Sequence, residues 1–240
     1  MLSATDAHAL RRLRALAALS EEERRAVSMA AEQSQHLRGS RDLIRAGQRT
    51  TGPLLVLAGW LGRVRLFSDG RRQILSFLVP GDVFQEPRTL EPVASSTVTA
   101  LCDSVICPAP AAEDAGLRDA YAASAAMDEA YLLRQIARLG RMSAYERIHD
   151  WLSEMYERLS LAGCAGQDSF TMPLTQETLA DALGLTSVHV NRTLQAMRRD
   201  GVLEWRGGTV RLKRAAGKPE ASSSAAVPAR VLPSRTAAAR

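Results

Sequence analysis

LTQETLADALGLTSVHVNRTLQAMRRDGVLEWRGGTVRL, residues 174–212, is the stretch that decides the fold. Its first part predicts two short helices. Thr175 can cap the first helix, and Gly184 can end it because glycine tolerates the left-handed conformation found at helix C-termini. Thr186 can then cap the second helix. Two helices joined by a three-residue turn that contains glycine form a helix-turn-helix, which we place at residues 175–199.

The second of these helices has an apolar face formed by Val190, Leu194 and Met197. Its opposite face carries small, amide and guanidinium side chains. Such groups read bases in the major groove, because Arg pairs bidentately with guanine and Asn or Gln pairs with adenine. We therefore predict double-stranded DNA as the ligand. The predicted contacts from this helix and its cap are Thr186, Ser187, Val188, His189, Asn191, Arg192, Gln195 and Arg199.

A β-hairpin is predicted directly after the second helix. Two alternating runs, 202–206 and 209–212, are separated by Gly-Gly, a typical two-residue hairpin loop. A wing would lie at this place in a winged helix-turn-helix, and Arg206 and Arg211 on it can reach the DNA backbone. A small helical domain with a solvated charged face is the alternative interpretation.

Positive charge is concentrated at the C-terminal end of the chain. The net charge is +5, while residues 186–240 alone hold eleven Lys and Arg against three acidic residues. A basic end on a slightly acidic body favours a polyanionic partner, although basic tails are often only solvated. Residues 215–240 are rich in Ala, Ser, Pro and Arg, and we predict that this tail is disordered because it can bury little apolar surface.

A region of short β-type runs precedes the helices, at residues 54–57, 61–67, 73–79, 98–101 and 105–107. Asp69-Gly70 between two of them predicts a hairpin with a type I′ turn. Several short strands at this spacing indicate an antiparallel barrel or roll. The predicted fold class is α+β, with an N-terminal antiparallel β-roll, a long helix and a C-terminal winged helix-turn-helix.

The long helix is predicted from residues 114–142, which contain no proline and many good helix formers. Ala125, Leu132, Ile136 and Leu139 share one face of it. This face would leave apolar surface uncovered unless something packs on it. Two interpretations remain open at this point: a partner helix in a homodimer, or the protein's own β-roll.

Helix caps predict where the parts of the chain meet. Ser20 with Glu23, and Ser143 with Glu146, have the spacing of capping boxes. The second box follows a break at Gly140, which is a natural hinge. The predicted parts are the N-terminal helices and roll at 1–116, the dimerisation helix at 117–142, the DNA-binding domain at 143–214 and the tail at 215–240.

The chain resembles the Crp/Fnr superfamily of bacterial transcription regulators over about residues 20–214. TQETLADALGLTSVHVNRTLQAMRRDGVLEW (175–205) is similar to the helix-turn-helix of that family. GWLGRVRLFSDGRRQILSFLVPGDVF (59–84) resembles its cyclic-nucleotide-binding-type β-roll, and LRQIARLGRMSAYERI (133–148) its dimerisation helix and hinge. The resemblance implies a homodimer on a palindromic operator, with RNA polymerase as a further partner if the protein is an activator.

The resemblance also assigns base-reading positions. Ser187, Val188 and Arg192 match the positions from which the family reads bases, and Asn191 matches another that some members use. Only Arg192 keeps the usual chemistry. The second position is commonly an acid that accepts from cytosine, and because Val188 cannot accept a hydrogen bond we expect a different operator.

The predicted effector pocket departs from the family. The resemblance places Glu86 where nucleotide-binding members hold a ribose hydroxyl, but the arginine expected to pair with the cyclic phosphate falls near Ala94 and Ser95. Leu132 and Leu133 replace hydroxyl side chains expected against the base. Since a buried phosphate without a guanidinium is costly, we predict that cyclic AMP does not control the protein. The candidate pocket residues are Glu86, Arg88, Ser95 and Ser96, with Arg88 either a substitute phosphate ligand or simply an exposed loop residue.

Other classes of protein fit the sequence less well. A metal-binding barrel enzyme of the cupin sort would need clustered histidines, but His36 is the only histidine in the β-type region. A nucleotide-sensing subunit of another enzyme would have no use for a helix-turn-helix. We therefore expect no catalytic residue, no metal and no cofactor. No apolar run reaches the 18 to 20 residues or so of a membrane span and no signal peptide follows Met1, so we expect a cytoplasmic protein that does not contact membranes.

Overall fold

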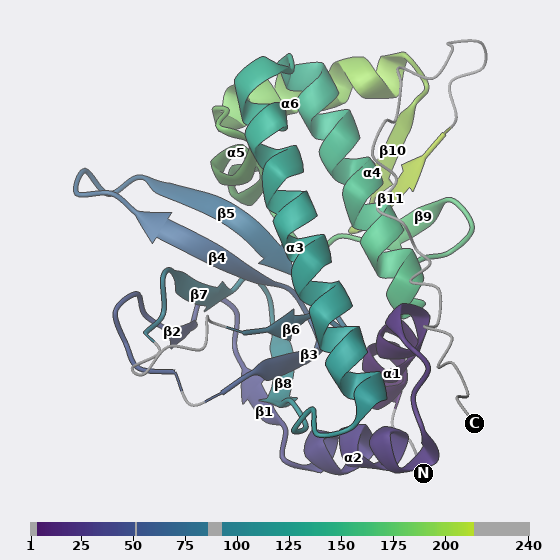
Figure 1. Ribbon diagram of the computed structural model, residues 1–240. Helices are drawn as coiled ribbons and strands as arrows, with labels where there is room; N and C mark the ends of the chain where they lie inside the picture. The colour runs from purple at the N-terminus through teal and green to yellow at the C-terminus, as the bar shows by residue number, and fades with distance from the viewer. Residues whose placement is uncertain (1–3, 51, 86–92, 214–240) are drawn as a thin grey trace, which may run out of the picture.

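The computed structural model describes residues 4–50, 52–85 and 93–213 of the chain. Two helices, α1 (Ala4–Leu16) and α2 (Glu21–Glu32), lie at one end of the molecule and lead into a β-roll (Figure 1). The predicted antiparallel roll is confirmed. Its strands are β1 (Gln35–Leu37), β2 (Asp42–Ile44), β3 (Leu54–Ala58), β4 (Leu61–Leu66), β5 (Arg72–Leu78), β6 (Val83–Phe84), β7 (Thr97–Ala100) and β8 (Ser104–Pro108).

Two four-stranded sheets make up the roll, with the strand orders β1-β8-β3-β6 and β2-β7-β4-β5. All of their pairings are antiparallel. The sequence pattern predicts five of the eight strands that the described residues of the roll form, and it misses β1, β2 and β6. These three are only two or three residues long, which is too short for alternation to be recognised.

The β4–β5 hairpin is present, but its turn is not the type I′ turn that we expected. Gly70 has a φ of 85°, whereas Asp69 is not among the residues with positive φ. Phe67 N–H donates to the Arg71 carbonyl at 2.9 Å, and Gly70 N–H donates to the Phe67 carbonyl at 3.0 Å. This is the pattern of a three-residue loop closed by a left-handed glycine, so the hairpin was predicted correctly and the turn type was wrong.

One long helix, α3 (Ala115–Arg141), runs along the roll toward the C-terminal part of the chain (Figure 1). On the predicted apolar face, Ile136 is 67% exposed, Leu132 is 37% exposed, Ala125 is exposed as well, and Leu139 is half-buried. The roll therefore leaves most of the apolar face predicted for this helix uncovered. The interpretation that this face packs on the protein's own roll is wrong. A different set of side chains faces the protein: Leu117, Ala120, Tyr121, Ser124, Met127, Tyr131, Gln135 and Arg138.

The C-terminal part begins after Met142. Both predicted capping boxes, Ser20 with Glu23 and Ser143 with Glu146, are present. The three strands of this part pair in the order β10-β11-β9, and β9 was not predicted. The elements are α4 (Ala144–Ala162), β9 (Ser169–Thr171), α5 (Gln176–Leu183), α6 (Ser187–Arg199), β10 (Leu203–Arg206) and β11 (Thr209–Leu212).

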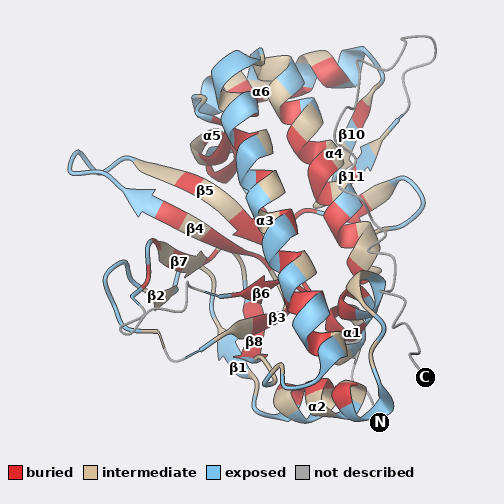
Figure 2. Cartoon of the chain, in the orientation of Figure 1, coloured by how far each residue is buried: buried red, intermediate tan, exposed pale blue. Residues whose placement is uncertain are grey.

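An aromatic cluster joins the roll to α4. The ring centroids of Trp60 and Trp151 are 6.3 Å apart, and those of Phe77 and Trp151 are 5.1 Å apart. All three side chains are buried, in one apolar cluster that continues into α5 and α6. Figure 2 shows α4 buried along most of its length, while α3 keeps an exposed side. The helix that carries the C-terminal part is thus packed firmly on the roll.

Charged side chains also lie inside the molecule where α1, the roll and α4 meet. Asp82 Oδ1 is 2.6 Å from Arg12 Nη2, and Asp82 Oδ2 is 2.6 Å from Arg158 Nη2. Glu154 Oε2 lies 2.6 Å from Arg138 Nη2 and Glu154 Oε1 lies 3.5 Å from Arg158 Nη1. We call these five residues the buried charge cluster. The sequence pattern did not predict it.

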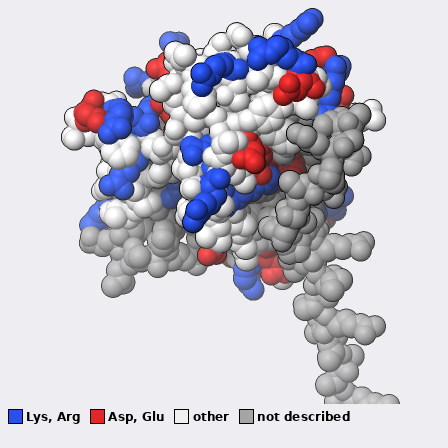
Figure 3. All heavy atoms as spheres, turned by 90° about the horizontal axis from the view of Figure 1, so that it is seen from above, with Lys and Arg blue, Asp and Glu red and all other residues white. Residues whose placement is uncertain are grey.

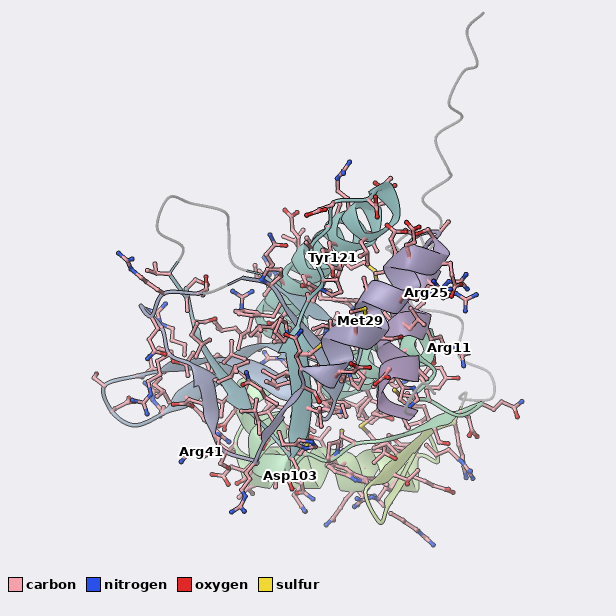
Figure 4. All side chains as sticks on the ribbon, turned by 90° about the horizontal axis from the view of Figure 1, so that it is seen from below. Arg11, Arg25, Met29, Arg41, Asp103 and Tyr121 are labelled. Carbon is pink, nitrogen blue, oxygen red and sulfur yellow. The ribbon has the colours of Figure 1, made fainter. Side chains whose placement is uncertain are left out.

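Figure 4 views the molecule from the end at which α1 and α2 lie, with Arg11 and Met29 on these helices and Tyr121 on α3. Glu23 of α2 accepts a hydrogen bond from Leu117 N–H at 2.7 Å. The same carboxylate therefore completes the cap of α2 and holds the first turn of α3. This end of the molecule is far from α6 (Figure 1).

Candidate nucleic-acid interface

The helix-turn-helix consists of α5 and α6. Thr175 Oγ1 accepts from Thr178 N–H at 3.1 Å at the start of α5, and Gly184 ends this helix with a φ of 62°. Thr186 Oγ1 accepts from His189 N–H at 3.2 Å at the start of α6. The caps and the glycine turn predicted from sequence are therefore all in place.

The outer face of α6 is open to solvent. Val190, Leu194 and Met197 are fully buried, as predicted, and pack α6 onto the rest of the domain. His189 and Asn191 are half-buried. The other predicted residues are exposed and together form what we call the recognition face: Thr186, Ser187, Val188, Arg192, Gln195 and Arg199.

Asn191 is held by amide hydrogen bonds on both sides. Its Nδ2 donates to Gln176 Oε1 at 3.0 Å, and its Oδ1 accepts from Gln195 Nε2 at 2.9 Å. These bonds link α5 to α6 and use both polar atoms of Asn191. By contrast, the part of the chain that the structure describes offers no hydrogen bond or ion pair to the guanidinium of Arg192.

The wing follows α6 as β10 and β11. Gly207 and Gly208 have φ values of 56° and 77°, which gives the two-residue turn with both central residues at positive φ that the sequence predicts. Arg206 is exposed at the end of β10. Arg211 Nε lies 3.2 Å from Asp168 Oδ1, but both side chains are about half exposed, so this pair is weak and can open when a phosphate approaches.

Basic side chains are prominent on the end of the molecule that carries α6. Figure 3 views this end, and more of its surface is coloured for Lys and Arg than for Asp and Glu. The last turn of α6 contributes Arg198 and Arg199, and its first turn contains no acidic residue. The predicted DNA contacts thus lie on a surface whose charge suits a polyanion.

Polar contacts to α5 hold the helix-turn-helix against the roll and α3. Arg72 Nε of β5 lies 2.5 Å from Asp181 Oδ2. The side-chain amides of Gln73 and Gln135 both donate to the Ala182 carbonyl, at 3.1 and 2.7 Å. The β4–β5 hairpin and α3 therefore fix the position of α5, and through it the recognition face.

The predicted effector residues are only partly within the described chain. Glu86 and Arg88 lie outside the described residues. Ser95 is exposed and Ser96 is buried, and both accept hydrogen bonds from Arg63 of β4, at 2.9 and 3.1 Å. Positions 94 and 95 indeed carry no charge, but a guanidinium reaches this place from another strand, which the sequence pattern did not reveal.

The space between the roll and α3 beside Arg63 is nearly filled. Its free volume is about 20 Å³, room for about one water molecule, whereas pockets for small ligands usually hold roughly 300 to 1,000 Å³. Burial, together with the charge of Asp82, raises the pKa of the Asp128 carboxyl to about 6. We call this space the roll pocket, and it is lined by Arg63, Ser76, Phe77, Leu78, Phe84, Gln85, Asp128, Tyr131, Leu132 and Arg158.

A larger cavity, of about 480 Å³, opens elsewhere in the roll, with Leu43, Leu54, Phe84 and Ile106 in its wall. It shares Phe84 with the roll pocket. The described residues that line it do not include Ser95, Ser96 or Leu132. Leu132 lines the roll pocket, and Ser95 and Ser96 are linked to it through their hydrogen bonds with Arg63.

Two family models match the chain. Residues 34–119 match the cyclic nucleotide-binding domain, and residues 146–217 match the Crp-like helix-turn-helix domain. The first covers the roll and the second covers the helix-turn-helix with its wing. Each model thus matches the part of the structure in which its features were found.

Curated relatives and a solved structure agree with this. The chain is 31% identical over 162 residues to the transcriptional activator protein FnrL of Cereibacter sphaeroides, covering 63% of this chain and 64% of that protein. It is 28% identical over 155 residues to the nitrogen fixation regulation protein FixK of Azorhizobium caulinodans, covering 62% of each. The aligned part thus spans slightly less than two thirds of these relatives. The structure of FixK2 from Bradyrhizobium japonicum is similar with a TM-score of 0.66 at 25% identity, covering 76% of this chain and 92% of that chain.

The chain therefore belongs to the Crp/Fnr superfamily of transcription regulators. The family consists of regulators with a helix-turn-helix DNA-binding domain rather than of enzymes. Within residues 4–50, 52–85 and 93–213, no helix is both long and apolar enough to cross a membrane. The same residues contain no group of three or more His, Cys, Asp or Glu arranged to hold a metal ion.

Proposed function

We propose that the protein is a homodimeric, sequence-specific regulator of transcription, which binds a palindromic operator through α6 and its wing and is not controlled by cyclic AMP. It acts in the cytoplasm, where its DNA lies, and contacts RNA polymerase if it activates. The proposed division of the chain is a roll domain to residue 116, a dimerisation helix at 117–142 and a DNA-binding domain at 143–214.

The observation that carries this proposal is the recognition face. A capped helix presents an unpaired guanidinium, small side chains and an amide to solvent, on a basic surface and beside a two-stranded wing. The proposed DNA contacts are the recognition face, His189, Asn191, Arg206 and Arg211. Arg192 is the proposed reader of a guanine, because its guanidinium has no partner among the described residues and its geometry suits bidentate pairing with guanine.

The dimer is supported by the exposed side of α3. Leu133 and Ile136, at 61% and 67% exposure, lie one turn apart with no cover from the described part of the chain. A second copy of the same helix would bury them in a two-fold arrangement. Sedimentation should show a dimer, and Ile136→Asp should shift it to a monomer while Val93→Asp, at a 48% exposed site on the roll, should not. A wild-type monomer on a single half-site would contradict the proposal.

Selection from random duplexes is the direct test of DNA recognition. Purified full-length protein should enrich an inverted repeat whose half-sites are centred about 34 Å apart, because a two-fold protein contacts one face of the duplex. Arg192→Ala should remove the preference for this sequence. Arg206→Ala should instead weaken binding to all duplexes alike, and so serves as the matched control. If no sequence is enriched and gel shifts show no binding, the proposed function is wrong.

A further inference from the structure

Val188 is the most exposed of the large apolar side chains in the described part of the chain, at 77%. It lies in the first turn of α6, between Ser187 and the half-buried His189, and one turn before Arg192. All of its neighbours on the recognition face are polar or charged. An isolated apolar side chain therefore stands at the place where the helix would meet DNA.

The local chemistry of the helix does not favour valine at this position. β-Branched residues lose side-chain freedom in a helix, and an acidic residue near a helix N-terminus is stabilising. The other helices whose N-cap side chain accepts a backbone hydrogen bond follow this rule, with Glu21 to Glu23 in α2, Glu146 in α4 and Glu177 in α5. In α6 the first turn contains no acid. The reason for Val188 is therefore to be sought in what its face contacts.

The major groove presents one apolar group, the 5-methyl group of thymine. We propose, on the basis of the function proposed above, that Val188 contacts the 5-methyl group of a thymine in each half-site and thereby specifies thymine at that base pair. Cytosine is disfavoured there because it lacks the methyl group, and its amino group would face an apolar side chain that cannot accept its hydrogen bond.

The positions of Val188 and Arg192 fix where this thymine lies. Residues four apart on a helix have Cβ atoms about 6 Å apart, and stacked base pairs are about 3.4 Å apart. The thymine is therefore within about two base-pair steps of the guanine that Arg192 reads. Asn191 does not read the base pair of this thymine, because its side-chain amide is already hydrogen-bonded to Gln176 and Gln195.

Defined changes to one base of each half-site test the contact. In the duplex selected by the protein, the thymine at this position is replaced in both half-sites by deoxyuridine, cytosine or 5-methylcytosine, and dissociation constants are measured for full-length wild type, Val188→Ala and Val93→Ala. A buried methyl group is worth about a fourfold change in affinity per half-site, or roughly fifteenfold for the dimer. Wild type and Val93→Ala should show this preference for thymine over deoxyuridine, and Val188→Ala should lose it.

The outcomes separate this inference from the proposed function. If a sequence is enriched and bound but wild type binds thymine and deoxyuridine equally, the methyl contact is refuted while DNA recognition stands. Tighter binding of 5-methylcytosine than of thymine would overturn the assignment to thymine. If Val188→Ala kept the full preference for thymine, another residue would be its reader. Val188→Ala should fold normally, because the side chain is exposed and alanine is the better helix former.

Discussion

The buried charge cluster and the recognition face use arginine in opposite ways. Arg12 and Arg158 have side-chain exposures of 0% and 2% and both contact Asp82. Arg192 is exposed and has no partner in the described part of the chain. Charges in the first region are paired within the protein, although Arg12 Nε and Nη1 and Arg158 Nε have no hydrogen-bond partner among the described residues. The Arg192 guanidinium is open to solvent instead, and it can pair with a ligand. Burial and pairing thus distinguish the arginines that hold the structure from the ones that bind.

The cluster also explains how the recognition face is placed. Asp82 belongs to the roll, Arg12 to α1 and Arg158 to α4, so three parts of the chain meet at one carboxylate. Any tilt of α4 relative to the roll would separate charges that have no access to water. The DNA-binding part is thus oriented by contacts within the protein itself.

Asp82→Ala should have the largest effect of any single substitution in these two regions. It leaves the Arg12 guanidinium buried without an acidic partner among the described residues and leaves Arg158 with Glu154 alone, and breaking a buried pair in this way typically costs about 3 to 5 kcal/mol. Chemical unfolding at fixed protein concentration should show this loss. Glu204→Ala is the matched control, because it removes a carboxylate from an exposed pair with Lys213 and should leave the midpoint unchanged. Equal midpoints for the two variants would contradict the role assigned to Asp82.

Arg192→Ala should have a smaller effect, confined to DNA. The loss should be roughly 1 to 3 kcal/mol at one base pair of each half-site, because one bidentate contact with a base is removed. Binding to random DNA should change little. Arg206→Ala should lower specific and random binding in the same proportion and reduce the salt dependence. An unchanged ratio of specific to random affinity in Arg192→Ala would show that α6 lies in the groove in another register.

What the sequence could predict depends on how far apart the interacting residues are. The caps at Thr175 and Thr186 and the turn at Gly184 were predicted because their partners lie within a few residues. The same holds for the Gly207-Gly208 turn. Short-range signals of this kind are visible in the sequence because the residues that interact lie within the same short segment. They were enough to identify the helix-turn-helix and the wing.

The buried charge cluster and the Arg63 contacts could not be predicted in this way. Arg158 and Asp82 are 76 residues apart, and Arg63 is 32 and 33 residues from Ser95 and Ser96. Only the packing of α4 on the roll and the pairing of β4 with β7 bring them together. One signal was present: Arg12 lies between the apolar Leu10 and Leu13 of an amphipathic helix, where a charge implies a buried partner.

Asp128 predicts a pH dependence of stability. Its pKa is raised to about 6, first by burial and then by Asp82, from an ordinary value of 3.8. Between about pH 4 and pH 6 the unfolded chain has released this proton while the folded protein still holds it, so stability falls as the pH rises. Asp128→Asn should therefore stabilise the protein by about 1 to 2 kcal/mol at pH 7.5, after allowance for partial exposure, and by almost nothing at pH 4. Thermal unfolding at both pH values measures this. Equal stabilisation by Asp128→Asn at both pH values would show that Asp128 does not have the raised pKa.

Cyclic AMP should have the smallest effect, namely none. The physical reason for this expectation differs from the missing guanidinium that the sequence indicated. Arg63 does bring a guanidinium to Ser95 and Ser96, so lack of positive charge is no longer the reason. The reason is space: a free volume of about 20 Å³ is too small for a nucleotide.

The side chains that fill the roll pocket are fixed by strong contacts. Arg158 is held by Asp82 at 2.6 Å and lies over the Tyr131 ring, 4.5 Å from its centroid. Admitting a nucleotide would require these contacts to break, and the Leu132 side chain offers no hydrogen bond to a base in return. Calorimetric titration of the dimer with cyclic AMP should therefore give no binding heat, and operator affinity should not change. Micromolar binding that raises operator affinity, and that Arg63→Ala removes, would overturn this prediction and identify Arg63 as the phosphate ligand.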